Sequence, residues 1–185
     1  MPLRVIAGSA GGRRLVAPKG SARPTTDRLK EALFASLGRH RTDDAVVLDL
    51  YAGSGALAIE ALSRGAARAV LVDRDFASEV AIRANVGEIG FADVARFQRS
   101  TVASFLAAPV PEAPFDLVFL DPPYDTASRE VADALAALAA GGLVVPGGTV
   151  VVERPKAAEP IELPAGWSTE KERTYGDTRL LFAVA

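Results

Sequence analysis

The sequence predicts an α/β fold built on a mostly parallel sheet. Two observations support this prediction: apolar runs typical of buried strands alternate with amphipathic stretches, and a glycine turn joins the first such run to the next helix. Residues 46–55 read VVLDLYAGSG, an apolar strand that breaks at Gly53-Ser54-Gly55. An amphipathic stretch, residues 56–64, follows at once. Strand, glycine turn and helix in this order form the first half of a nucleotide-binding βαβ unit.

Asp49 lies inside the strand that precedes this turn. A plain G-x-G turn serves dinucleotides and other adenosine cofactors alike, because glycines let a ligand approach the backbone and the helix N-terminus offers free N–H donors. The arrangement D-x-x-x-G-x-G at residues 49–55 resembles motif I of the S-adenosylmethionine (AdoMet) methyltransferases. The residues expected to contact the cofactor are Asp49, Tyr51, Ala52, Gly53, Ser54 and Gly55. The alternative is a turn that only joins a strand to a helix.

Composition restricts the class of protein. With 185 residues, 49% hydrophobic and 24% charged, the chain suits one compact domain with a small appendage. No run is long enough to span a membrane, and residues 1–20 are too basic and too interrupted for a signal peptide, so we expect a cytoplasmic protein. The absence of cysteine excludes disulfides and thiolate chemistry, and a single His40 leaves no histidine cluster, so no metal is expected.

Positive charge is concentrated at the N-terminus. Residues 1–41 hold nine Arg or Lys against Asp27 and Glu31, a balance of +7, whereas the remainder has a balance of −9. Two β-like runs, 3–7 and 14–17, flank a glycine-rich turn and predict a basic β-hairpin arm over residues 1–22, ahead of a main domain over residues 23–185. Candidate RNA-binding residues are Arg4, Arg13, Arg14, Lys19 and Arg23. A solvated arm without such a role is the alternative.

Further cofactor contacts are expected on either side of the glycine turn. Asp73 ends a second apolar run, residues 69–72, where a carboxylate accepts hydrogen bonds from ribose hydroxyls, and Arg74 follows it. Asp73 could instead cap the next helix, but Asp75 is better placed to do so. We expect the segment RPTTDR at 23–28 to fold over the cofactor with Thr25 and Thr26, unless it only caps a helix. Thr101 stands where many methyltransferases place an acid or amide that touches adenine.

A second motif follows the fourth apolar run. Residues 117–120 deliver Asp121, Pro122, Pro123 and Tyr124 to the carboxyl edge of the sheet, beside the glycine turn. Consecutive prolines fix φ and leave the Pro122 carbonyl as an acceptor, Asp121 adds a second acceptor, and Tyr124 offers a flat face for a base. This set predicts a catalytic receptor for an exocyclic amino group on a planar ring. A rigid turn is the alternative.

The remaining segments complete the predicted sheet. A weak third strand at 94–98 and a short helix at 101–107 precede the second motif, and an alanine-rich helix at 127–140 and a fifth strand at 149–153 follow it. Prolines at 155, 160 and 164 leave little room for another helix. Residues 167–175 and 179–184 predict a hairpin turned by Gly176-Asp177.

Taken together, these segments resemble the RsmD family of 16S ribosomal RNA guanine-N2 methyltransferases. The resemblance covers essentially the whole chain: the basic hairpin, RPTTDR at 23–28, the block DLYAGSGALAIEALSRGA at 49–66, DPPY at 121–124 and YGDT at 175–178. It implies a Rossmann-like class I AdoMet-dependent methyltransferase with a seven-stranded sheet that ends in an antiparallel hairpin. DPPY alone would fit any amino-group methyltransferase, whereas the block at 49–66 together with the N-terminal segment indicates this family.

The resemblance implies a specific reaction: transfer of a methyl group from AdoMet to N2 of guanine 966 in 16S rRNA, with S-adenosyl-L-homocysteine as product and no metal. It also implies that a cytoplasmic monomer acts on an assembled 30S subunit or late precursor. Two alternatives stay open. One is a DNA adenine-N6 methyltransferase, although the chain lacks a separate target-recognition domain. The other is a non-catalytic RNA-binding ribosome-assembly factor, against which the intact Asp49, Asp73 and Asp121 count.

Overall fold

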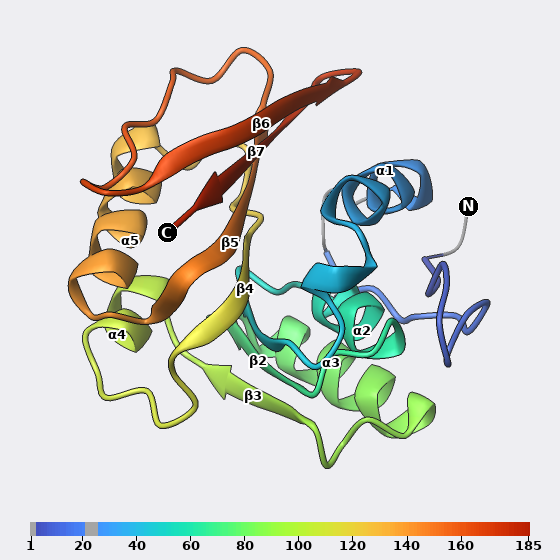
Figure 1. Cartoon of the computed structure of the whole chain (residues 1–185). Helices are drawn as coiled ribbons and strands as arrows, with labels where there is room; N and C mark the ends of the chain where they lie inside the picture. Colours follow the sequence, from blue (N-terminus) through green and yellow to red (C-terminus); the bar gives the residue numbers. More distant parts are fainter. Residues whose placement is uncertain (1–2, 21–25) are drawn as a thin grey trace.

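A computed structural model describes residues 3–20 and 26–185 as a seven-stranded sheet between two layers of helices (Figure 1). The strand order is β3-β2-β1-β4-β5-β7-β6, and neighbouring strands are parallel except at β7, which runs antiparallel to both β5 and β6. The strands are β1 Val46–Leu50, β2 Arg68–Asp73, β3 Ala95–Arg99, β4 Phe115–Leu120, β5 Val144–Pro155, β6 Ser168–Tyr175 and β7 Thr178–Val184. The predicted parallel sheet with a terminal antiparallel hairpin is confirmed.

Helices cover both faces of the sheet (Figure 1). One face carries α1 (Asp27–Leu37), α2 (Ala56–Ser63) and α3 (Phe76–Ile89), and the other carries α4 (Val102–Leu106) and α5 (Ser128–Ala140). A short 3-10 helix, η1 (Arg39–Arg41), follows α1. No helix in the described part of the chain is both long enough and apolar enough to cross a membrane.

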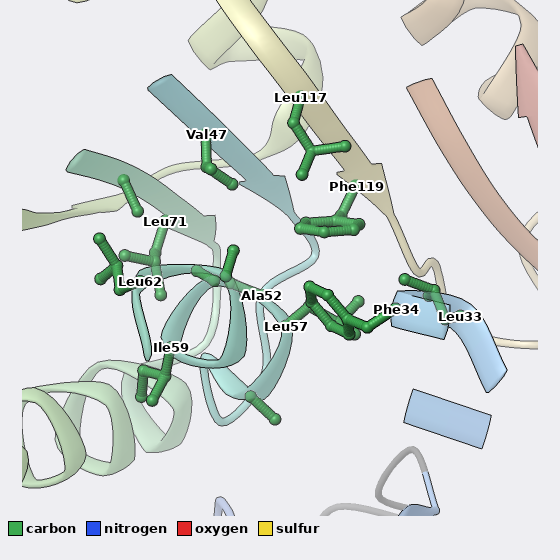
Figure 2. Packing of buried hydrophobic residues seen from close by; sticks show 14 of the residues in the cluster. Leu33, Phe34, Val47, Ala52, Leu57, Ile59, Leu62, Leu71, Leu117 and Phe119 are labelled. Carbon is green, nitrogen blue, oxygen red and sulfur yellow. The ribbon is translucent and has the colours of Figure 1, made fainter. Parts of the chain in front are cut away.

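Alternate side chains of each central strand belong to two separate cores, as the period of a strand requires. Val47, Leu71 and Phe119 pack against α1, α2 and α3, and Figure 2 shows the Phe34 and Phe119 rings of this core next to each other, tilted by 56° with their centroids 5.8 Å apart. Leu48 and Val118 point the opposite way, toward α4 and α5. All eight residues of α2 are buried, so this helix is enclosed on every side. Because of the same alternation, Asp49 faces the α2 side of β1.

The fifth strand is longer than the sequence predicts. It begins at Val144 rather than at residue 149, and its pairing with β4 shifts register between Phe115 and Leu117. Gly147, with φ 81°, lies in the stretch where this shift occurs. The irregular backbone explains the difference, because VVPGG resembles a turn in sequence but continues the strand after a local bend.

The N-terminal segment forms a short antiparallel hairpin within residues 3–15. Val5 N donates to Arg13 O over 2.9 Å, Leu15 N donates to Leu3 O over 2.8 Å, and Arg4 pairs with Arg14 as an isolated bridge. The apolar residues of this arm, Leu3, Val5, Ala10 and Leu15, are buried in the α1–α2–α3 core. The arm is therefore packed against the main body, where it buries apolar surface that a free hairpin would expose.

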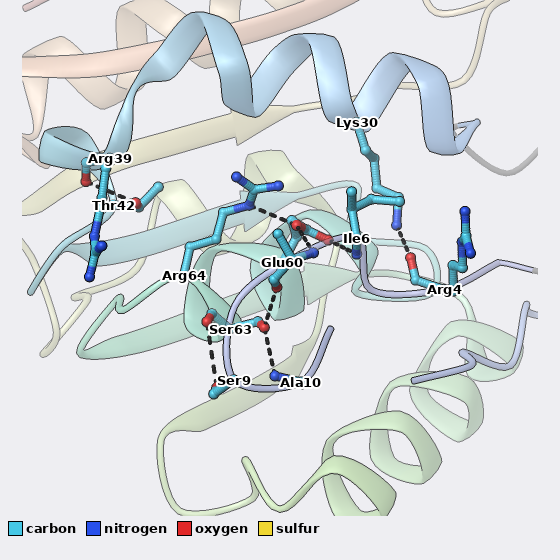
Figure 3. Close-up of polar contacts among 11 residues, drawn as sticks. Arg4, Ile6, Ser9, Ala10, Lys30, Arg39, Thr42, Glu60, Ser63 and Arg64 are labelled. Carbon is cyan, nitrogen blue, oxygen red and sulfur yellow. Dashed lines mark hydrogen bonds and ion pairs between the residues drawn. The ribbon is translucent and has the colours of Figure 1, made fainter. Parts of the chain in front are cut away.

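Polar side chains of α2 fix the arm in place (Figure 3). The buried Glu60 accepts hydrogen bonds from Ile6 N (2.7 Å), Ala7 N (3.1 Å) and Arg64 Nε (2.7 Å). Ser63 Oγ accepts from Ala10 N over 2.9 Å and donates to Ala7 O over 2.5 Å. Lys30 Nζ from α1 donates to Arg4 O. These contacts satisfy backbone groups that would otherwise be buried without partners.

Candidate active site

The glycine turn between β1 and α2 depends on left-handed backbone conformations. Tyr51, Gly53 and Gly55 have φ of 63°, 56° and 77°. At Gly55 a Cβ would lie 2.8 Å from Leu71 Cδ2 and 3.2 Å from Ile82 Cγ1, so only glycine lets the strand and helix pack this closely. Among residues 3–20 and 26–185, the one atom within 4 Å of a Cβ at Gly53 would be Tyr51 O, at 4.0 Å. This part of the chain therefore leaves space beside Gly53, where a ligand could approach the backbone.

Asp49 is buried at the base of this turn, with 1% of its surface exposed. Its Oδ2 accepts a hydrogen bond from Ala58 N over 3.1 Å, whereas its Oδ1 has no hydrogen-bond partner among the described residues. Burial raises the pKa of the Asp49 carboxyl well above its ordinary value, and the nearby carboxylates of Asp121 and Asp73 add to this, against the Ala58 hydrogen bond. A buried carboxyl oxygen without a donor fits a site that a polar ligand completes.

Asp73 closes the turn from the end of β2. Its carboxylate accepts from Gly53 N over 2.8 Å and from Asp75 N over 2.9 Å. Asp75 occupies the N-cap position of α3, yet its side chain makes no capping hydrogen bond. The next residue, Arg74, is exposed and lies 3.9 Å from Asp75 in an ion pair. Asp73 thus links the β2 end to the glycine turn, and its partly exposed carboxylate has capacity for further donors.

The second motif lies beside the first because β4 is the neighbour of β1. Leu50 pairs with Leu120, and Asp121 N donates to Leu50 O over 3.4 Å. Asp121 is partly exposed, and its carboxylate is near enough to Asp49 to raise the pKa of that group. The predicted convergence of the two motifs at one edge of the sheet is therefore present.

Tyr124, Pro122 and Pro123 differ in exposure. Pro122 is buried and Pro123 exposed, and Tyr124 is 47% exposed. Its ring is accessible, which suits the stacking role predicted for it, although its hydroxyl bonds to Thr178 over 2.9 Å. The prolines and a hydrogen bond from Thr126 N to Pro123 O (2.9 Å) restrict the backbone on both sides of the tyrosine.

Tyr51 connects the turn to the opposite helix layer. Its hydroxyl lies 3.3 Å from Glu130 Oε1 on α5. Burial raises the pKa of Tyr51 to about 12, and the charge of Glu130 adds to the rise. Tyr51 therefore stays neutral at physiological pH and acts as a hydrogen-bond donor.

Two predicted cofactor contacts, Thr101 and Thr26, act as helix caps. Thr101 is exposed at the N-terminus of α4, where its Oγ1 accepts from Ser104 N, and it therefore acts as a helix cap here. Thr26 likewise caps α1 by accepting from Leu29 N over 3.3 Å. Thr25 lies outside the described residues, as does Arg23 of the RNA-binding set.

The predicted RNA-binding side chains divide into two groups. Arg4 pairs with Asp27 over 2.8 Å, and Arg13 Nη2 donates to Glu88 O over 2.6 Å. Arg14 and Lys19 are exposed, and neither forms an ion pair with another described residue. Arg14 and Lys19 are thus the members of the set most available to a phosphate.

Sequence patterns do not reveal every residue at this edge. Thr178, at the start of β7, and Arg154, near the end of β5, both contact the loop that follows Asp121. The YGDT segment at 175–178 marks the place of Thr178, but nothing in its local sequence indicates its partner. Within residues 3–20 and 26–185, no group of three or more His, Cys, Asp or Glu side chains is arranged to hold a metal.

Comparison with known proteins identifies the family. A family model described as conserved hypothetical protein 95 matches residues 3–184. Over 175 residues the chain is 37% identical to ribosomal RNA small subunit methyltransferase D of Escherichia coli strain K12, covering 94% of this chain and 85% of that relative. The chain belongs to the RsmD family.

The RsmD assignment agrees with likeness to solved structures. The Escherichia coli protein yhhF has a TM-score of 0.86 at 36% identity, covering 100% of this chain and 98% of that one. An RNA methyltransferase from Salinibacter ruber, solved in complex with S-adenosyl-L-homocysteine, has a TM-score of 0.64 at 20% identity, covering 88% of this chain and 93% of that one. The fold is that of the class I AdoMet-dependent methyltransferases, as the sequence predicts.

Proposed function

We propose that this RsmD-family chain is an enzyme that transfers a methyl group from AdoMet to the exocyclic N2 of a guanine in 16S ribosomal RNA. The observation that carries the proposal is the register of β1 with β4, which sets Asp121-Pro122-Pro123-Tyr124 beside the glycine turn that follows Asp49. Residues 49–55 suit an adenosine cofactor and residues 121–124 suit an amino group. Their position side by side at one edge of the sheet therefore supports methyl transfer to nitrogen. The relative named ribosomal RNA small subunit methyltransferase D supports rRNA as substrate.

The residues around the turn fit AdoMet. Asp49 leaves Oδ1 without a hydrogen-bond donor among the described residues, and the space above Gly53 admits a ligand to the backbone. The partly exposed Asp73 carboxylate is suited to accept from ribose hydroxyls. Tyr51, Ala52, Ser54 and Arg74 border the same turn, and Thr25, Thr26 and Thr101 also belong to the proposed cofactor site. AdoMet would supply a methyl group on a sulfonium. Transfer of this methyl group to the amine nitrogen would leave a neutral thioether, and the methylated nitrogen would then lose one proton to become a neutral amine.

The chemical task of the protein is to activate and orient an aromatic amine. The amine is a poor nucleophile because its lone pair is delocalised into the ring. Asp121 and the Pro122 carbonyl would accept its N–H hydrogens, which favours a pyramidal nitrogen and stabilises the positive charge that develops on it. Tyr124 would stack on the base, with Pro123 stiffening the backbone between them. Most of the rate then comes from positioning and fixed dipoles.

The substrate must present an unpaired or flipped guanine to reach Asp121. We propose that Arg4, Arg13, Arg14, Lys19 and Arg23 contact the RNA backbone outside the active site. Guanine 966, a monomeric enzyme, and an assembled 30S subunit or late precursor as the substrate are further parts of this proposal. A cytoplasmic location follows from that substrate.

Two other functions make different predictions. An adenine-N6 DNA methyltransferase would act on an oligomer in which adenine replaces the target guanine. A non-catalytic assembly factor would bind RNA without binding AdoMet. Calorimetric titration of AdoMet and a guanine-to-adenine substrate pair separate these possibilities.

The decisive experiment is methyl transfer from labelled AdoMet to bare 16S RNA and to 30S particles that lack the modification. We expect labelled guanine-N2 in the particles, located by nuclease mapping, and less in bare RNA. Label on adenine, or AdoMet binding without transfer to either substrate, would contradict the proposal.

A further inference from the structure

The ring of Tyr124 is held at the end farthest from the backbone. Its hydroxyl lies 2.9 Å from Thr178 Oγ1, and either group can donate this hydrogen bond. Thr178 is the first residue of β7 and is buried, whereas the Tyr124 ring is half-exposed. The two residues are 54 positions apart in the sequence. The C-terminal hairpin therefore reaches residues 121–128, the loop after β4 together with the first residue of α5, which we call the DPPY loop.

The neighbouring strand holds the same loop at a second place. Arg154 Nη1 donates to Thr126 O over 3.0 Å, and Nη2 donates to Ser128 Oγ over 2.9 Å. Arg154 is nearly buried, so its hydrogen bonds are shielded from water. In the β5–β7 pairing Pro155 lies opposite Thr178, and Arg154 lies opposite Arg179. The contacts to the DPPY loop therefore come from adjacent positions of two paired strands.

Such an arrangement reduces the freedom of the Tyr124 side chain. Pro122 and Pro123 restrict the backbone before the tyrosine, and the Arg154 contacts restrict the backbone after it. A hydrogen bond at the hydroxyl leaves the ring fixed at both ends while the residue stays 47% exposed. A platform that is already ordered loses less conformational entropy when a planar group stacks on it.

We infer that Thr178 is a positioning residue that orients the Tyr124 ring for the nucleobase presented to Asp121. This inference rests on the proposed function, because it assumes that a base stacks on Tyr124. Thr178 does not touch the base and acts through the tyrosine hydroxyl. The C-terminal hairpin, through Thr178 of its YGDT segment, thereby takes part in binding the target.

A double-mutant cycle tests this inference with the full-length enzyme, AdoMet and 30S particles. Thr178→Val and Tyr124→Phe should each raise KM for the particle about two- to tenfold, the value of one neutral hydrogen bond, with a smaller change in kcat. The double variant should match either single variant, because both remove the same bond. Thr178→Ser should restore KM to within about twofold, since it keeps the hydroxyl. Thr149→Val, a buried threonine in the middle of β5, is the matched control.

The outcomes separate the inference from the proposed function. If the wild-type enzyme methylates the particle but Thr178→Val keeps the wild-type KM, or if the two single effects multiply in the double variant, Thr178 does not act through Tyr124. If the wild-type enzyme transfers no methyl group, the proposed function itself fails. Thermal melting of every variant shows whether a loss comes from unfolding, and Thr178→Ser then tests the hydroxyl in a folded protein.

Discussion

Two buried carboxylates on consecutive elements, Glu60 on α2 and Asp49 on β1, have opposite surroundings. Glu60 accepts two backbone N–H groups of the arm and the guanidinium of Arg64. Asp49 accepts one backbone N–H, and its second oxygen has no partner in the described chain. A carboxylate whose capacity is filled by its own chain anchors structure, whereas one left incomplete at a turn with open space is suited to a ligand. Burial alone does not distinguish the two roles.

Removing the Glu60 carboxylate, which anchors the arm, should have the largest effect on stability. Glu60→Ala leaves Ile6 N, Ala7 N, Arg64 and the buried Lys30 without their acceptor or counter-charge. We expect the free energy of unfolding to fall by about 3–5 kcal/mol, as for other broken buried ion pairs, measured by urea denaturation. Glu31→Ala, an exposed glutamate on α1, should change it by less than about 0.5 kcal/mol. A loss below about 1 kcal/mol in Glu60→Ala would mean that the arm does not depend on this anchor.

Substitution of Asp121, at the carboxyl edge of the sheet, should reduce activity and leave stability unchanged. Asp121→Ala should lower kcat by about 10² or more, as when one preorganised group that stabilises developing charge is removed. AdoMet affinity should stay unchanged, because Asp49, the turn and Asp73 remain. Asp121→Asn should be milder, since its amide oxygen still accepts an N–H. Asp125→Ala, exposed on the same loop, is the control. A folded Asp121→Ala enzyme with the wild-type rate would remove the basis for the amino-group receptor.

The incomplete hydrogen bonding of Asp49 should make the free energy of unfolding depend on pH. Its folded pKa is raised well above the unfolded value of 3.8. As pH rises above about 4, the unfolded chain therefore loses this proton before the folded chain does, and the contribution of Asp49 to wild-type stability falls until the folded pKa is passed. In Asp49→Asn this contribution is absent, so its stability relative to wild type should increase over the same range. Urea denaturation at several pH values measures the difference. A difference that is constant with pH would show that Asp49 does not titrate as stated.

The smallest effect should come from the exposed charges of the arm. Replacing Arg14 and Lys19 by Ala should reduce the slope of log binding constant against log salt by about 0.7–0.9 for each lost phosphate contact. AdoMet affinity and the melting temperature should not change, because neither side chain pairs with a described residue. Arg68→Ala with Arg173→Ala, exposed elsewhere, is the matched control. An equal change in slope for both pairs would mean that the arm attracts RNA only through total charge.

The sequence predicts the sheet and both motifs well because each depends on local pattern. Apolar runs indicate β1, β2 and β4, and the parallel order brings residues 49–55 and 121–124 to one edge. The missing parts depend on contacts between distant residues. The α2 side chains Glu60 and Ser63 bind the arm from more than 50 positions away. Tyr124 and Thr178 meet only because β7 inserts beside β5. The strand β5 is also longer than predicted, since its irregular pairing tolerates Gly147-Gly148.

The place of β7 in the sheet also constrains the order in which the strands can pair during synthesis. β7 follows β6 in the chain but lies between β5 and β6, and its side chains Leu180 and Phe182 are buried. On the ribosome, β6 has no strand to pair with until residues 178–184 have left the exit tunnel. The growing chain can pair β1 to β5 while the edge of β5 stays open, which makes that edge the surface at risk of aggregation during synthesis. Because Thr178 belongs to β7, the DPPY loop acquires its Tyr124 contact only when this strand pairs with β5.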